Sequence, residues 1–184
     1  IEGLPASVQI FSLLDHNRDL TRLLCDMLLL SPQLGNQLRK HPTLFDLLLY
    51  QAFFEPLPDA ETMVIKLRDS CKDLPVEEAL DHLKIKIREW KFRVEVQALS
   101  QTIDSADLAN GLSAVATATV VLIMDFAKAD MVRRHGQIEG KVNIHGLGRL
   151  GTKQMTVSSD LDMLVIYEAS GSALSNSKRP ISAP

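Results

Sequence analysis

Apolar residues recur at helical spacing along most of the chain up to residue 136. Near 75–102, five of them follow one another at alternating intervals of three and four residues and would form one stripe of a long helix: Leu80, Leu83, Ile87, Trp90 and Val94. A second long helix is predicted near 105–135, and shorter helices precede both. Helix starts are predicted at prolines, which the first turn of a helix tolerates: Pro5, Pro32, Pro42 and Pro75. Residues 1–136 are therefore predicted to form a helical domain.

The pattern changes after a run of basic residues and Gly136, which mark the end of a helix. Segment 141–147 alternates between apolar and polar residues, and 161–167 is a continuous apolar run typical of a buried central strand. We predict two strands joined by a turn. Residues 169–184 are rich in Ser, Gly and Pro and are predicted to form a loop or a disordered tail. The predicted fold class is mainly α, with two strands at the C-terminal end.

Composition and charge narrow the classes of function. The 184 residues carry a net charge of −3, with 46% hydrophobic and 23% charged residues, a mixture typical of globular proteins. No overall basic field favours a nucleic-acid partner. The apolar segment 112–126 is shorter than the roughly 20 residues that span a membrane, so a buried helix and no membrane partner are predicted. Cys25 and Cys71 lack disulfide or zinc spacing, which fits reduced thiols in the cytoplasm.

Three glycines, Gly146, Gly148 and Gly151, match the GxGxxG pattern of dinucleotide-binding proteins. That fold requires a crossover helix after the third glycine, but only nine residues separate Gly151 from Leu161, and several of them form helices poorly. A P-loop would need Lys before Thr, whereas the chain has Thr152 followed by Lys153. We therefore expect the glycines to form a tight turn between the two strands.

Two aspartates, Asp160 and Asp162, lie at the start of the second apolar run. In a strand their carboxylates would point to the same face, and paired carboxylates are suitable ligands for Mg²⁺. Two such ions can activate an attacking oxygen and stabilise a departing pyrophosphate. Backbone amides of the turn at Gly151 and Thr152, with the Ser159 hydroxyl, could hold the phosphates. An Asp-x-Asp pair alone is common, and it is more typical of a solvated strand end with paired aspartates in a turn.

The whole constellation resembles a known family. A glycine turn followed by Asp-x-Asp leading into a buried strand is similar to the signature of the nucleotidyltransferase superfamily related to DNA polymerase beta. The segment GLGRLGTKQMTVSSDLDMLVIYE resembles bacterial glutamine synthetase adenylyltransferase, also called glutamate-ammonia-ligase adenylyltransferase. The preceding helical region is also similar, through the segments IFSLLDHNRDLTRLLCDMLLLSPQLGNQLRKHPTLFDLLL, KFRVEVQALSQTID and RRHG. KQMTVSSDLD is more similar to the C-terminal, AMP-adding module of that bifunctional family than to its AMP-removing module.

The resemblance implies transfer of AMP from ATP to a tyrosine of glutamine synthetase, in the control of nitrogen assimilation. It implies Mg²⁺ as cofactor, with glutamine synthetase and a PII-type nitrogen-signalling protein as partners. Asp160 and Asp162 would bind the metal and serve catalysis. The residues implied in nucleotide binding are Gly148, Arg149, Gly151, Thr152 and Ser159, of which Arg149 would contact phosphate or support the local fold. Arg149 and Thr152 stand where family members usually have Lys and Gly or Ser.

Residues 137–184 would then be the N-terminal part of an α/β nucleotidyltransferase domain. The superfamily's third carboxylate lies on a later strand, and no matching segment follows Asp162. The chain also begins at Ile1 without a signal peptide. We therefore expect a piece of a longer protein, inactive by itself. The alternative is a helical protein-interaction module in 1–136 with an incidental Asp-x-Asp.

Overall fold

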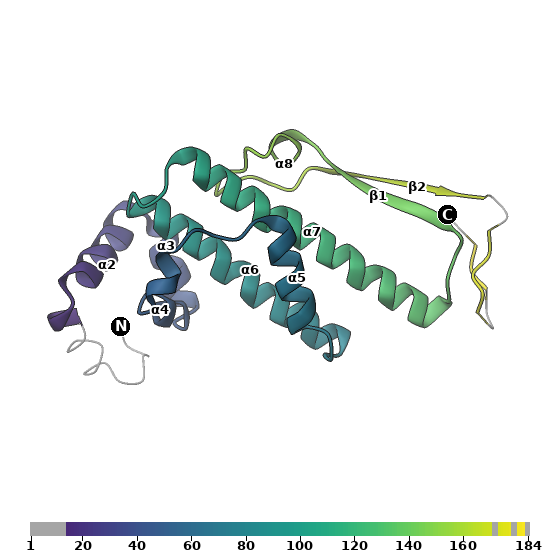
Figure 1. Ribbon diagram of the computed structural model, residues 1–184, viewed down its shortest axis with the longest axis horizontal. Helices are drawn as coiled ribbons and strands as arrows, with labels where there is room; N and C mark the ends of the chain where they lie inside the picture. Colours follow the sequence, from purple (N-terminus) through teal and green to yellow (C-terminus); the bar gives the residue numbers. More distant parts are fainter. Residues whose placement is uncertain (1–13, 171–172, 178–179, 183–184) are drawn as a thin grey trace. The chain divides into compact units, whose positions relative to one another are not determined.

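The computed structural model of the chain describes residues 14–170, 173–177 and 180–182 (Figure 1). These residues form helices followed by a two-stranded antiparallel sheet, which confirms the predicted mainly α fold class. The helix start predicted at Pro5 lies outside the described residues. Two compact units divide the chain: unit 1 comprises Ile1–Leu57 and Arg88–Leu108, and unit 2 comprises Pro58–Ile87 and Ala109–Pro184. The domain boundary expected at residue 136 stays a prediction.

Unit 1 is built from short helices, whose ends match signals in the sequence. Helix α2 (Arg18–Leu30) begins after Asn17, whose side chain accepts a hydrogen bond from the Leu20 amide at 3.1 Å. Ser31 caps α3 (Pro32–Lys40) in the same way, and Pro32 occupies the first turn as predicted. The short helix α4 (Leu44–Leu47) and the 3₁₀ turn η1 (Gln51–Phe54) follow.

The core of unit 1 forms where these helices meet the second half of α6 (Val76–Leu99). Phe92 is fully buried, and its ring centroid lies 5.9 Å from that of Phe53. The buried cluster consists of Leu20, Met27, Leu34, Leu44, Leu48, Phe53, Phe92 and Val96. The apolar stripe predicted for 75–102 includes Trp90 and Val94. In the structure, Val94 is fully buried. Burial of several large apolar side chains, each contributing about 1.5–3 kcal/mol, stabilises this unit.

Polar side chains of α6 are also buried in unit 1. The Gln97 amide donates to the carbonyls of Phe53 and Glu55, at 2.8 and 2.7 Å, and so holds the segment after η1. Glu95 is only 6% exposed, and one of its carboxylate oxygens accepts from the Gln37 amide at 3.0 Å. The other oxygen, Oε1, has no hydrogen-bond partner among the described residues. Burial raises the pKa of Glu95, against the opposing effects of Lys91 and the Gln37 hydrogen bond.

Unit 2 contains α5 (Ala60–Ser70), the first part of α6, most of α7 (Ser105–His135) and the hairpin. Asp104 caps α7 by accepting from the amides of Ala106 and Asp107, each at 2.8 Å. The helix ends, as predicted, at a glycine in the left-handed conformation, Gly136, with φ 78°. An Arg68–Asp125 ion pair at 2.5 Å joins α5 to α7. Cys25 and Cys71 are both free.

Helix α7 is longer than the apolar segment identified in the sequence. Among the described residues it is the one helix long and apolar enough to cross a membrane by length and composition, and 33% of that window is buried. Its buried residues are Leu112, Ser113, Val115, Ala116, Ala118 and Leu122. Length therefore does not separate a core helix from a membrane helix here, and the absence of a membrane partner stays a prediction.

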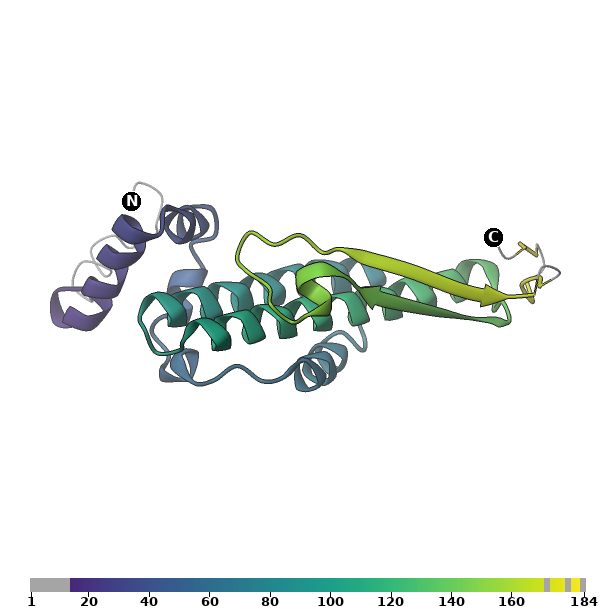
Figure 2. The ribbon, with the colours of Figure 1, turned by 90° about the horizontal axis from the view of Figure 1, so that it is seen from above.

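The hairpin pairs β1 (Gly140–Gly146) with β2 (Met163–Ala169), with Gly146 opposite Met163 and Gly140 opposite Ala169. It lies along one side of α7 (Figure 2). The expectation that the second strand is a buried central strand is wrong, because the consecutive residues Met163 to Tyr167 are each 42–54% exposed. No further strand among the described residues pairs with β2, so the sheet has two strands.

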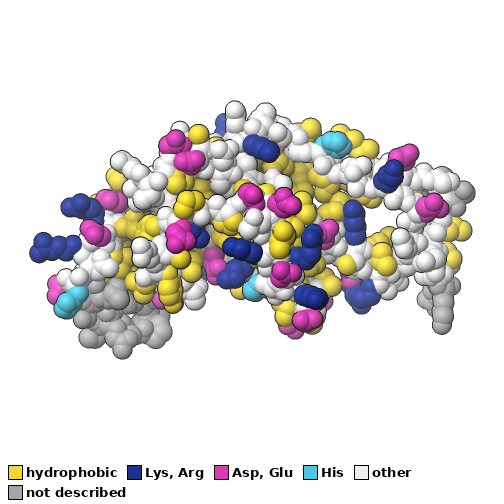
Figure 3. Space-filling model, in the orientation of Figure 1, with side chains coloured by type: hydrophobic (Ala, Val, Ile, Leu, Met, Phe, Trp, Pro, Cys, Tyr) yellow, Lys and Arg dark blue, Asp and Glu magenta, His cyan; other side chains and the backbone are white. Residues whose placement is uncertain are grey.

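The described part of 169–184 is less irregular than predicted. Leu174 and Ser182 form an isolated antiparallel bridge, and Ser175 is buried. The Asn176 side chain accepts from the Gln137 amide at 2.8 Å, which ties this turn to the end of α7. On the face shown in Figure 3, acidic and basic side chains are interspersed.

We predict that Glu95→Gln stabilises the protein at neutral pH. The folded-state pKa of Glu95 is raised, so its contribution to stability is fully present below the unfolded-state pKa and is lost as pH rises through the folded-state pKa. The amide introduced by Glu95→Gln stays neutral at every pH, so the variant does not lose stability through ionisation of this side chain. We expect a gain of about 1 kcal/mol, or a thermal midpoint about 2–4 °C higher, at pH 7.

Thermal unfolding followed by circular dichroism between pH 4 and pH 8 measures this effect. The advantage of Glu95→Gln should shrink as pH falls, and Glu139→Gln, at an exposed carboxylate, should show no such trend. A Glu95→Gln midpoint that is lower than wild type at pH 7 would contradict the interpretation.

Candidate active site

The two aspartates lie immediately before β2 rather than within it. The strand begins at Met163, so the expectation that Asp160 and Asp162 share a strand face is corrected. The ladder nevertheless extends by one hydrogen bond, because the Leu147 amide donates to the Asp162 carbonyl at 2.8 Å. This bond holds the backbone of Asp162 beside the turn that follows β1.

The glycine turn contains the single-turn helix α8 (Gly148–Gly151). Gly148 has φ +50°, in the left-handed region that favours glycine. A Cβ atom at Gly148 would lie 3.0 Å from Oδ2 of Asp162, and a Cβ at Gly151 would lie 2.5 Å from the Gly146 carbonyl oxygen. The glycines therefore allow the turn to close tightly against the Asp162 carboxylate. The predicted tight turn is confirmed, and its role in serving the aspartates stays a prediction.

Several polar groups of the turn are hydrogen-bonded within the turn itself. The Gly151 amide donates to the Leu147 carbonyl at 3.0 Å, and the Thr152 amide and hydroxyl both donate to the Gly148 carbonyl at 3.1 Å. These donors are engaged within α8 in this structure. Their predicted role in holding phosphate stays a prediction, and it would require these bonds to be shared or exchanged.

The loop from Thr152 to Ser159 is held by a side-chain network that the sequence analysis did not identify. The Arg149 guanidinium donates to the Thr156 hydroxyl at 3.0 Å. The Thr156 amide donates to the Ser159 hydroxyl at 2.9 Å, and the two hydroxyls lie 2.8 Å apart. We call Arg149, Thr156 and Ser159 the loop clasp. Its signal in the sequence is two hydroxyl residues three positions apart, an arrangement common in tight turns.

One apolar residue anchors the same loop on α7. Met155 is 5% exposed, and its amide donates to the hydroxyl of Ser113 at 3.3 Å. Ser113 is itself buried on α7 and also donates to the Ala109 carbonyl. A single large apolar residue within a polar loop is the sequence signal that could have identified this anchor.

Carboxylate oxygens are the ligands that Mg²⁺ prefers, so the chemistry of Asp160 and Asp162 fits this ion. Asp162 is exposed, and Gly148, which has no side chain, approaches its carboxylate closely. Within the described ranges, no group of three or more His, Cys, Asp and Glu side chains is arranged to bind a metal. The candidate site is therefore a pair of carboxylates beside a bare turn.

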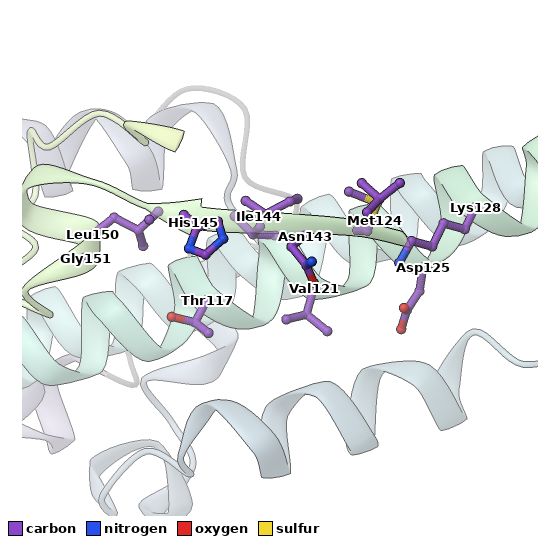
Figure 4. Close-up of a pocket in the computed structure, with 13 residues that line it drawn as sticks. Thr117, Val121, Met124, Asp125, Lys128, Asn143, Ile144, His145, Leu150 and Gly151 are labelled. Carbon is purple, nitrogen blue, oxygen red and sulfur yellow. The ribbon is translucent and has the colours of Figure 1, made fainter. Parts of the chain in front are cut away.

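A separate groove of about 520 Å³ lies between α7 and the strand β1 (Figure 4). His145 and Asn143 point from β1 toward α7, whereas Asp125 points away from β1. Gly146, Leu150 and Gly151 line its end, but neither Asp160 nor Asp162 does. The carboxylate pair is therefore not part of the lining of this groove.

Comparisons with a family model and with individual proteins identify the same family. The sequence model of the family described as glutamate-ammonia ligase adenylyltransferase matches residues 21–183. A protein of Mesorhizobium japonicum is 34% identical over 170 residues, covering 91% of this chain and 17% of that protein. A Brucella suis protein is 33% identical over 172 residues, with the same coverage of 91% and 17%. A Bartonella quintana protein is 29% identical over 184 residues, covering 98% and 19%.

All three relatives are named bifunctional glutamine synthetase adenylyltransferase/adenylyl-removing enzyme. The chain spans 17–19% of their length. The similarity thus covers nearly all of this chain and a small part of each relative.

We predict that Gly148→Ala destabilises the hairpin turn. The new Cβ would stand 3.0 Å from the Asp162 carboxylate, and alanine disfavours φ +50°. We expect a loss of about 1–2 kcal/mol in the free energy of unfolding, measured by denaturant titration. Gly111→Ala is the matched control, because Gly111 lies within α7 and alanine favours helix. Equal stability of Gly148→Ala and wild type would contradict the role given to Gly148.

Proposed function

Because this chain belongs to the glutamate-ammonia ligase adenylyltransferase family, we propose that it is part of an enzyme that transfers AMP from ATP to a tyrosine hydroxyl of glutamine synthetase. The reaction releases pyrophosphate and adjusts nitrogen assimilation. The observation that carries the proposal is the Asp162 carboxylate beside Gly148, with Asp160 two residues before it. This combination provides hard oxygen ligands next to a glycine that has no side chain.

In the proposed mechanism, Asp160 and Asp162 hold Mg²⁺ through their carboxylate oxygens. When bound, Mg²⁺ neutralises charge on the triphosphate and the departing pyrophosphate. The bare turn at Gly148 and Gly151 admits phosphate oxygens close to the backbone. Thr152 and Ser159 supply hydroxyl groups, and Arg149 places a positive charge at the same turn. Each of these groups lies on the segment that connects β1 to β2.

We assign the chain to the AMP-adding module rather than the AMP-removing module, on the basis of the KQMTVSSDLD segment. The names of the relatives include both activities, and these names support either module. ATP would be the nucleotide substrate, and a PII-type protein would convey the nitrogen signal. Cytoplasmic location fits the two free cysteines, since thiols persist in reducing compartments.

We predict that replacing both carboxylates, Asp160→Asn with Asp162→Asn, lowers AMP transfer to glutamine synthetase by more than about 100-fold, because the amides cannot bind Mg²⁺ as carboxylates do. The measurement is incorporation of radiolabelled AMP by a protein of the relatives' length that carries this sequence. Asp81→Asn, which removes an exposed carboxylate of α6, is the control and should retain activity. Near-wild-type transfer by the double variant would refute the proposed site.

We also predict that the 184-residue chain by itself transfers AMP at less than about 1% of the rate of the longer protein. Two-metal phosphoryl chemistry needs metal ions held from several sides, and the described residues contain no group of three or more His, Cys, Asp and Glu side chains that could hold a metal. Both proteins would be assayed with the same glutamine synthetase and Mg²⁺-ATP. Comparable rates would show that the pair suffices. Tight binding of glutamine synthetase by a chain that carries the double substitution would instead favour the helical interaction module.

A further inference from the structure

The two aspartates are supported by different parts of the structure. The backbone of Asp162 is held by the extra ladder bond from Leu147, and its carboxylate lies against Gly148. Asp160 lies two residues before Asp162, outside the strand, and is exposed. The hairpin therefore holds the backbone of Asp162 directly, whereas the backbone of Asp160 follows the loop that precedes it.

The loop clasp ends at the residue next to Asp160. Ser159 receives the Thr156 amide at 2.9 Å and contacts the Thr156 hydroxyl at 2.8 Å. The same Thr156 hydroxyl accepts from Arg149 at 3.0 Å, and Arg149 belongs to α8. Thr156 is therefore the one residue of the clasp that contacts both others, and it connects the glycine turn to the backbone in front of Asp160.

A second contact fixes the clasp on α7. Met155 directly precedes Thr156, is buried, and donates its amide to Ser113. Because neighbouring residues share a rigid peptide unit, the buried Met155 limits the movement of Thr156. The loop is thus attached to α7 through Met155 and to α8 through Arg149, and both attachments meet at Thr156.

We propose that Thr156 is a positioning residue of the adenylyl-transfer site, which sets the place of the Asp160 carboxylate through Ser159 and relative to the glycine turn through Arg149. This inference rests on the proposed function. Thr156 contacts neither the metal nor the nucleotide in this role. Removing its hydroxyl releases Arg149 and one of the three hydrogen bonds between Thr156 and Ser159, whereas the Asp162 support remains.

The test compares Thr156→Val with Thr156→Ser and Thr119→Val in a protein of the relatives' length that carries this sequence. Valine keeps the shape of threonine without the hydroxyl, and serine keeps the hydroxyl. Thr119→Val is the matched control, because its hydroxyl bonds only within α7, to the Val115 carbonyl. AMP transfer to glutamine synthetase is measured against the concentrations of Mg²⁺, ATP and glutamine synthetase.

We expect Thr156→Val to lower kcat about tenfold or more and to raise the Mg²⁺ concentration for half-maximal activity, as for groups that orient metal ligands. The KM for glutamine synthetase should be unchanged, and Thr156→Ser and Thr119→Val should stay close to wild type. Thr156→Val activity equal to that of Thr119→Val would overturn the proposal. Equal losses in kcat and in affinity for glutamine synthetase would also overturn it, because they indicate general unfolding.

Amide hydrogen exchange in the unsubstituted protein provides a second test that does not depend on a variant's folding. The Met155 and Thr156 amides should exchange slowly, since both are hydrogen-bonded to side-chain hydroxyls. If the Met155 and Thr156 amides exchange as fast as amides of an open loop, the loop clasp is contradicted. The result of Asp160→Asn with Asp162→Asn separates the two proposals: if that variant remains active, the proposed function fails, whatever Thr156→Val does.

Discussion

The antiparallel pairing of β1 with β2 is the constraint on which the candidate site depends. Its register sets Gly146 opposite Met163, and one further bond joins Leu147 to Asp162. The residues between Leu147 and Asp162 must therefore form one loop whose two ends are hydrogen-bonded to each other. Because the loop closes there, the glycine turn at its start and Asp162 at its end lie side by side. A shift of the register by one residue would move each β2 side chain to the opposite face and separate the turn from Asp162.

Two strands alone are a weak basis for such a site, since an isolated hairpin is marginally stable in water. The hairpin has additional attachments in unit 2. Met155 is buried against α7, and Asn176 bonds to Gln137 at the other end of the hairpin. The apolar residues of β2 stay half exposed, which is unusual for five consecutive large side chains. The stability of the turn therefore depends on a few polar contacts and one buried methionine more than on a core beneath the sheet.

The sequence alone predicted the helices well because their signals are local. Prolines marked the starts of α3 and α6, periodic apolar residues marked α6, and Gly136 marked the end of α7. The same reasoning failed for β2, because burial of a strand depends on which other segments cover it. A continuous apolar run indicates a strand that is suited to burial. It contains no information on whether other segments cover that strand.

For the site, the sequence identified the glycines and aspartates through type and spacing, and their closeness follows from a short hairpin. The engagement of Gly151 and Thr152 within α8 could not be predicted, because it depends on the conformation of a four-residue helix. The Met155 contact with Ser113 joins residues 42 positions apart and has no local signal of its pairing. Glu95 looks like a surface residue of an amphipathic helix, and only the packing of unit 1 shows that it is buried.

The most direct test of the central claim is a crystal structure of a protein of the relatives' length that carries this sequence, with Mg²⁺ and a non-hydrolysable ATP analogue. The account predicts Mg²⁺ at about 2.0–2.1 Å from an oxygen of Asp160 and an oxygen of Asp162, with the triphosphate against the turn at Gly148. A nucleotide bound in the groove between α7 and β1, or a metal with no ligand from this aspartate pair, would contradict it.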